Sequence, residues 1–284
     1  MKKIHFTIMT IVLAMGFSCT TNTDVEESYV PQEKQFMKQA RNYERIMKPM
    51  LSARYGEKEA EELLLIIDKK AEAFIPEIIF LGTNNKFIEN YFAAAFLIPT
   101  IRILEEKGMR EREIGKLIYD SAAQGYEEMV TPFVKWQFRT FVMGVEDMYR
   151  DAAKTQASTW PGDWKAIAVE GDGESFDYGM DFTECGILSL YKAQGLEHYV
   201  KYICLCDYAI WSQFDVELIR TQTLGNGAPY CDFRYKEKGS PKEGWPPEDL
   251  PEFSTLESLL EEKDKEKKKI SCHSCIGCGA CTLG

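Results

Sequence analysis

The sequence predicts an α+β protein, with a helical first half packed with a small antiparallel sheet and helices in the second half. From residue 32 to residue 156, apolar side chains recur every three or four positions, which is typical of amphipathic helices. After Pro161 and Gly162 interrupt this pattern, short runs rich in β-branched and aromatic residues flank glycine-rich turns, which indicates strands. A helical block followed by paired strands favours the α+β class.

The helical half divides into runs that end at glycine or proline. In the first run, Phe36, Ala40, Tyr43 and Ile46 follow helical spacing, and Gly56 provides a stop. Proline interrupts the second run, and the third is apolar enough to form the centre of the core. The expected helical runs are 33–55, 57–82, 84–108, 110–130 and 132–156.

The second half alternates strands with one helical stretch. Residues 164–172 and 176–185 read as strands around the turn-rich "GDGES", and residues 186–214 return to helix. Residues 216–225 and 228–236 read as a strand pair across "GNGAP", a loop rich in turn-forming residues. An antiparallel sheet is therefore expected between residues 164 and 236.

The N-terminus predicts export. Two lysines precede a short apolar stretch that ends in "GFSC", which resembles a bacterial lipoprotein signal peptide over residues 1–18. That resemblance implies a lipid on Cys19, a tether over residues 19–31, and a membrane-anchored protein of the cell envelope, periplasmic or surface-exposed. The alternative is plain secretion, with Cys19 unmodified.

The charge limits the partners. The formal net charge is -11, and binding to nucleic-acid phosphates needs clustered lysine and arginine, so no nucleic-acid partner is expected. In an exported protein the other eight cysteines could pair as disulfides, so this interpretation stays open.

A cysteine-containing stretch, "YICLCDY", stands out. Cys204 and Asp207 are three residues apart, which places both on one face of a continuous helix, while Cys206 points elsewhere. A carboxylate beside a thiol can serve as an acid/base partner or bind a cationic group. The alternative is that these cysteines are ordinary buried packing.

The order of motifs around these residues resembles the L-2-amino-thiazoline-4-carboxylic acid hydrolase family over residues 176–236. The segments "DFTECGILSLYKAQGLEHYVKYICLCDYAIW" and "RTQTLGNGAPYCDFRY" carry the resemblance. It implies hydrolytic opening of a 2-aminothiazoline ring or a related cyclic amidine, a small-molecule substrate, and no cofactor for the core.

The chemistry of that reaction suggests roles for the residues. The amidine-like ring carbon needs a nucleophile and a proton donor. The catalytic candidates implied by the resemblance are Cys204, Asp207, Cys231 and Cys185. Arg220 is the candidate for the substrate carboxylate, or else a strand residue in a salt bridge, and His198 is a second binding candidate or a surface residue.

The C-terminus carries a separate cysteine motif. Cys272, Cys275, Cys278 and Cys281 form CxxCxxCxxC, which could bind an iron–sulfur cluster or zinc, form disulfides, or be modified.

The sequence thus predicts a hydrolase-like domain over residues 32–236, a linker with a charged helix over 237–270, and a cysteine-rich tail over 271–284. The rival function is a non-catalytic, membrane-tethered protein on the same scaffold that binds ligands or metal or exchanges thiols.

Overall fold

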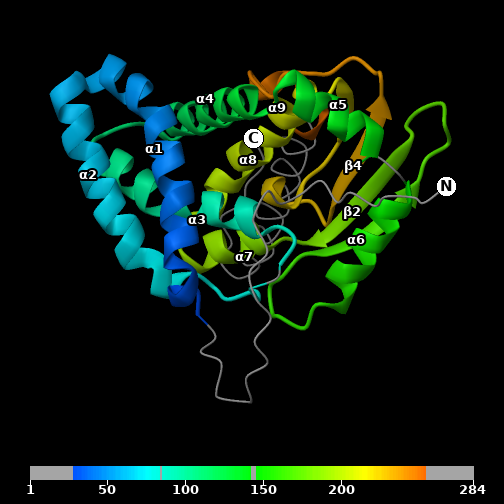
Figure 1. Cartoon of the computed structure of the whole chain (residues 1–284), viewed down its shortest axis with the longest axis horizontal. Helices are drawn as coiled ribbons and strands as arrows, with labels where there is room; N and C mark the ends of the chain where they lie inside the picture. The colour runs from blue at the N-terminus through cyan, green and yellow to red at the C-terminus, as the bar shows by residue number, and fades with distance from the viewer. Residues whose placement is uncertain (1–27, 84, 142–144, 254–284) are drawn as a thin grey trace, which may run out of the picture.

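The computed structural model describes residues 28–83, 85–141 and 145–253, and confirms the α+β prediction. Figure 1 shows helices α1 and α2 on one side of the molecule, strands β2 and β4 on the other, and α3, α7 and α8 between them. The segment predicted to be a signal peptide, Cys19 and the tail cysteines lie outside the described residues. None of the described helices is long and apolar enough to cross a membrane.

The helical half follows the predicted runs closely. The first helix ends at Gly56, whose φ of 84° is easily adopted by glycine, and Pro76 ends the second in a short 3-10 turn. The third helix is buried along most of its length, as its apolar composition predicts. The helices are α1 (Glu33–Tyr55), α2 (Glu57–Phe74), α3 (Ile88–Glu106), α4 (Glu111–Met129), α5 (Pro132–Phe141) and α6 (Val145–Ala157).

Four antiparallel strands form one sheet in the order β1-β2-β4-β3. The predicted strand pair is present, because Ile219 lies opposite Arg234, but an irregular connection with a 3-10 turn separates the two strands. The strands are β1 (Lys165–Glu170), β2 (Tyr178–Glu184), β3 (Val216–Ile219) and β4 (Cys231–Glu237).

One face of the sheet is apolar and the other is polar. Met180 lies opposite Phe233, and Leu218 lies opposite Tyr235, so these side chains share the face that packs on the helices. On the other face, Asp181 forms an ion pair with Arg234. Among the described residues, the helices therefore cover the apolar face of the sheet. The C-terminal ends of β2 and β3 and the start of β4 lie together at one end of the sheet, beside these helices.

The stretch predicted as one helix after β2 is broken into pieces. Gly195, with a φ of 69°, ends the first piece, and Leu205 forms a turn between the next two. Cys204 and Asp207 are therefore not on one face of a continuous helix; the break lies between them. The pieces are α7 (Gly186–Ala193), a 3-10 turn (Glu197–Tyr199), α8 (Val200–Cys204) and α9 (Cys206–Gln213).

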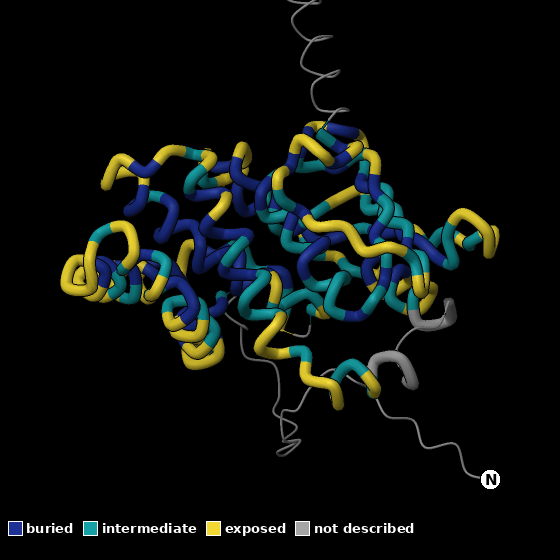
Figure 2. The backbone as a smooth tube through the Cα atoms, turned by 90° about the horizontal axis from the view of Figure 1, so that it is seen from above, coloured by how far each residue is buried: buried dark blue, intermediate teal, exposed yellow. Residues whose placement is uncertain are grey.

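Both segments flanking the predicted domain pack onto it. Tyr29, from the segment interpreted as tether, is fully buried, and its ring lies 5.1 Å from that of Phe92. At the other end, Leu250 and Glu252, from the segment interpreted as linker, are 2% and 1% exposed. Figure 2 shows the buried backbone running through the middle of the molecule and exposed segments outside it.

One carboxylate between α1 and α2 predicts a pH dependence of stability. Burial, followed by the negative charge of Asp68, raises the pKa of Glu44 to about 7, although Arg41 opposes the shift. Since this pKa is higher in the folded state, the associated stability is complete below pH 4.5 and is lost as the pH rises towards 7.

We therefore expect Glu44→Gln, which mimics the protonated acid, to raise the urea midpoint at pH 8 and to leave it nearly unchanged at pH 4.5. Glu72→Gln, at an exposed position of α2, serves as the control. Equal midpoint shifts at the two pH values would contradict this assignment.

Candidate functional site

The candidate residues converge at one end of the sheet. Phe182 near the end of β2 lies opposite Cys231 at the start of β4, and Cys185 follows β2 directly. Arg220 follows the last residue of β3. Because neighbouring antiparallel strands run in opposite directions, the ends of β2 and β3 and the start of β4 meet at the same end of the sheet. There α8 and α9 supply Cys204 and Asp207.

Glycines allow the close approaches on which this arrangement depends. A Cβ atom on Gly186 would lie 2.5 Å from the Trp164 ring, so glycine is required where α7 begins. A Cβ atom on Gly225 would lie 3.2 Å from the sulfur of Cys204, which shows how closely the connection between β3 and β4 approaches that thiol.

Arg220 is at the centre of a buried network. Its side chain is 0% exposed, and its Nη1 donates to Asp207 Oδ2 at 2.7 Å. Its Nε and Nη2 donate to Glu252 at 2.9 and 2.7 Å, and Nη2 also donates to the carbonyl of Cys204 at 2.8 Å. The Arg220 guanidinium also lies 4.8 Å from the centre of the Phe233 ring. The guanidinium therefore binds the protein's own carboxylates, in contrast to the expected contact with a substrate carboxylate.

The Asp207 side chain is partly exposed to solvent and partly enclosed by the protein. Its side chain retains 35% exposure, and one of its oxygens is held by Arg220. Burial raises the pKa of Asp207; Arg220 opposes the shift and Glu252 adds to it. Such a carboxyl can exchange a proton with a ligand at a pH above the usual aspartate range.

Three thiols lie near enough to Asp207 for its charge to act on them. Burial raises the pKa of Cys185 to about 11 and that of Cys231 to about 12, and it raises the pKa of Cys204 strongly; the charge of Asp207 adds to all three shifts. Nearby donors oppose the shifts: the Leu224 amide donates to Cys231 Sγ at 3.1 Å, and the Leu188 and Ile187 amides lower the pKa of Cys185. All three cysteines are free thiols.

Two residues lie outside the cluster. The charge of Asp207 also raises the pKa of Cys206, but this thiol donates to the carbonyl of Tyr202 and acts on the pKa values of tyrosines on α1, α4 and α7, so it lies on the helical side of Asp207. His198 is exposed, its ring lies 4.5 Å from that of Tyr199 in a tilted arrangement, and no contact given for the described residues links it to the three thiols.

Aromatic side chains flank the thiols and Asp207. The Phe182 ring lies 5.3 Å from that of Phe233, and Trp211 lies 4.5 Å from Tyr235. Phe182, Phe233 and Trp211 are only partly buried, so they offer apolar surface for a flat heterocycle beside the polar groups.

Sequence reasoning missed Glu252 and Trp164. Glu252 comes from a proline-rich acidic segment with no periodicity, and Trp164 from the edge of a predicted strand, so neither position carries a recognisable motif. Asp232, on β4, accepts hydrogen bonds from the Thr221 and Gln222 amides, both at 2.9 Å, and so holds the start of the connection that follows β3.

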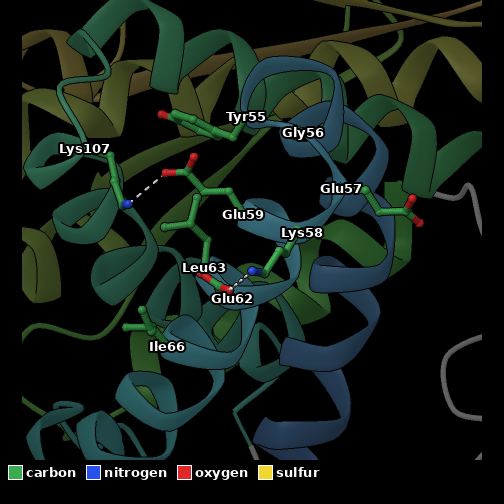
Figure 3. A pocket seen from close by; sticks show the side chains of 9 residues that line it. All are labelled: Tyr55, Gly56, Glu57, Lys58, Glu59, Glu62, Leu63, Ile66 and Lys107. Carbon is green, nitrogen blue, oxygen red and sulfur yellow. Dashed lines mark hydrogen bonds and ion pairs between the residues drawn. The ribbon is translucent and has the colours of Figure 1, made fainter.

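A surface hollow at the corner between α1 and α2 has a different character. Figure 3 shows Lys107 paired with Glu59 and Lys58 paired with Glu62, at 2.9 and 3.9 Å. Its lining contains no cysteine, histidine or aspartate. Within the described residues, no group of histidine, cysteine and acidic side chains has the arrangement of a metal site. The cluster around Asp207 is therefore the candidate site.

Comparison with known proteins agrees with the resemblance seen in the sequence. A family model described as L-2-amino-thiazoline-4-carboxylic acid hydrolase matches residues 89–235, which is just over half of the chain. No curated protein and no solved structure matches the chain. The matched span runs from α3 to β4 and includes Asp207, Arg220 and the three clustered thiols. The chain belongs to the L-2-amino-thiazoline-4-carboxylic acid hydrolase family.

Proposed function

We propose that the protein hydrolyses L-2-aminothiazoline-4-carboxylate, or a related cyclic amidine, to the ring-opened N-carbamoyl thiol. The observation that carries this proposal is Asp207, a carboxylate that solvent reaches and that lies among three thiols in a chain of this hydrolase family. A hydrolase of this family implies a small-molecule substrate.

The substrate's charge suits Asp207. A protonated 2-aminothiazoline is an amidinium-like cation in which the ring nitrogen and the exocyclic nitrogen, both bonded to ring carbon C2, carry N–H groups. The Asp207 carboxylate can accept hydrogen bonds from these groups while Arg220 fixes its other oxygen. The partly buried rings of Phe182 and Phe233 can contact the face of the heterocycle.

The reaction adds water across the bond between C2 and sulfur. A water oxygen bonds to C2 and the C2–S bond breaks. One proton of the water is transferred to the departing sulfur, which leaves as a thiol, and the other is released to solvent as C2 becomes the urea carbonyl of the cationic substrate. Asp207 is placed to carry the proton to sulfur. In a two-step version, a cysteine sulfur attacks C2 first and water then releases it, so the same bonds change overall.

A cationic substrate would also activate the thiols. The negative charge of Asp207 raises the pKa of Cys185, Cys204 and Cys231, so a cation bound to Asp207 cancels this effect and adds its own attraction for a thiolate. The thiols would then be unreactive in the empty site and more acidic when substrate is bound.

Single alanine variants of the clustered cysteines test the proposal. We expect the chain from residue 28 to turn over the aminothiazoline, followed by mass spectrometry, and one of Cys185→Ala, Cys204→Ala or Cys231→Ala to lose at least 100-fold in kcat/KM if a thiol attacks. Cys206→Ala should retain activity, because this thiol faces the helices.

The outcomes separate the two versions and the rival function. Activity in all four variants would assign the attack to water. No turnover by folded, reduced wild-type protein would remove the hydrolase proposal and leave a binding or thiol-exchange protein on the family scaffold. We further propose that the N-terminal signal places this reaction at the cell envelope and that the tail cysteines act separately.

A further inference from the structure

The segment after the sheet closes over the candidate site. Residues 244–253, here termed the C-terminal strap, follow β4 and lie outside the span matched by the family model. The strap begins where the Gly244 amide donates to Tyr119 Oη at 2.9 Å, and a Cβ atom at Gly244 would lie 2.7 Å from the Leu205 carbonyl oxygen. Trp245 then packs against Tyr119 and Tyr202. These contacts fix the strap against α4 and the break between α8 and α9.

The strap ends in a buried carboxylate. Glu252 is 1% exposed, and both of its oxygens accept hydrogen bonds from Arg220. Tyr208 Oη also donates to Glu252 Oε2 at 2.7 Å, and Asn226 Nδ2 donates to the Glu252 carbonyl at 3.0 Å. The carboxylate of Glu252 is therefore held by Arg220 and Tyr208, and its backbone carbonyl by Asn226, so the side chain has little freedom to move.

Arg220 stands between two carboxylates of unequal exposure. Glu252 takes two donors of the guanidinium and Asp207 takes one, while the Asp207 side chain remains 35% exposed. Because Glu252 already balances the single positive charge, Arg220 can orient Asp207 without neutralising it in an exclusive pair. Asp207 then keeps its ability to accept a proton or a cation.

We propose that Glu252 is a positioning residue of the site, which holds Arg220 in the orientation that presents Asp207 to the ligand and prevents Arg220 from pairing with Asp207 alone. The catalytic consequence rests on the proposed function; the effect on Asp207 itself does not. The strap is thus part of the site, although it lies outside the matched span.

Several charged or titratable groups face Asp207 besides Glu252. Arg220 lies beyond β3, the tyrosines come from α4, α9 and β4, and the cysteines are those whose pKa values the charge of Asp207 raises. These groups are Arg220, Tyr126, Tyr208, Tyr235, Cys185, Cys204, Cys206 and Cys231. Arg220 is the cation among them, so removal of the Glu252 charge leaves its attraction to Asp207 unbalanced.

The test is a carbon-13 NMR titration of the Asp207 carboxyl in the full chain. Glu252→Gln keeps the shape of the side chain and removes its charge, and we expect the pKa of Asp207 to fall by about one unit or more. Glu248→Gln is the matched control, since Glu248 lies in the same strap but pairs with exposed Arg112; the pKa of Asp207 should not change.

The pH dependence of kcat/KM measures what the loss of the Glu252 charge does to catalysis. If Asp207 acts as the base, the acid limb of kcat/KM moves to lower pH in Glu252→Gln, and kcat on the plateau falls by roughly 10- to 100-fold because the orientation of Asp207 is lost. A merely structural Glu252 would lower the amount of folded protein without moving this limb.

Each outcome is decisive. An unchanged pKa of Asp207 in folded Glu252→Gln overturns the proposal. If this variant does not fold, the wild-type titration decides: a pKa of Asp207 at or below about 4, the ordinary aspartate value, overturns it, and a raised pKa supports it. A wild-type protein that shows the raised pKa but no hydrolysis would remove the proposed function and retain the role of Glu252.

Discussion

Asp207→Asn is expected to reduce kcat/KM for the aminothiazoline by about 10²- to 10⁴-fold, the usual contribution of a general acid or base. The amide can still accept a hydrogen bond from Arg220 Nη1, so the fold is expected to persist. It cannot carry a proton between water and the ring sulfur, and it pairs weakly with a cationic amidine. Steady-state kinetics with folding checked by circular dichroism measures this loss.

The sheet provides a matched control for this substitution. Asp181 pairs with Arg234 at 2.7 Å, the same separation as between Asp207 and Arg220, but on the polar face of the sheet. Asp181→Asn should therefore leave kcat/KM within about twofold. Comparable losses in the two variants would mean that Asp207 has no special role.

Arg220→Met is expected to give the largest loss of stability, about 3 to 5 kcal/mol in the free energy of unfolding. The substitution leaves Glu252, which is 1% exposed, without its cation, and leaves Asp207 without the donor to its Oδ2. A loss of this size is a large share of the stability of a typical domain. Urea denaturation at pH 7 measures it.

Arg234→Met, on the polar face of the same sheet, should cost less, because Arg234 and Asp181 keep 20% and 25% of their side-chain surface in solvent, whereas Arg220 and Glu252 keep 0% and 1%. The deficit of Arg220→Met should also shrink as the pH falls towards 4, because protonation removes the negative charge that the substitution leaves without a partner. A deficit independent of pH would contradict the buried-charge explanation.

The sequence was a good guide to elements whose pattern is local. Gly56, Pro76 and the spacing of Phe36, Ala40 and Ile46 mark helices that the structure contains. The break at Leu205 was not predicted, because an apolar stretch with helical spacing carries no signal for a turn imposed by tertiary contacts.

The candidate site was predictable in membership more than in geometry. Cys185, Cys204, Asp207, Cys231 and Arg220 do lie together, which the order of motifs indicated. The partner of Arg220 was not predictable, since Glu252 is 32 residues away in the chain and reaches Arg220 only because the strap folds back. Long-range ion pairs leave no periodic trace in a single sequence.

The break between α8 and α9 at Leu205 also bears on how this part of the protein folds. In an uninterrupted helix the Tyr208 amide would donate to the carbonyl of Cys204; here it donates to that of Leu205, and Arg220 Nη2 takes the vacated acceptor. Leu205 itself keeps helical dihedrals, so what changes at this position is the hydrogen bonding. A chain in which Arg220 has not yet docked gains by donating the Tyr208 amide to the Cys204 carbonyl, so the break and the arginine network should form and melt together as a single cooperative unit.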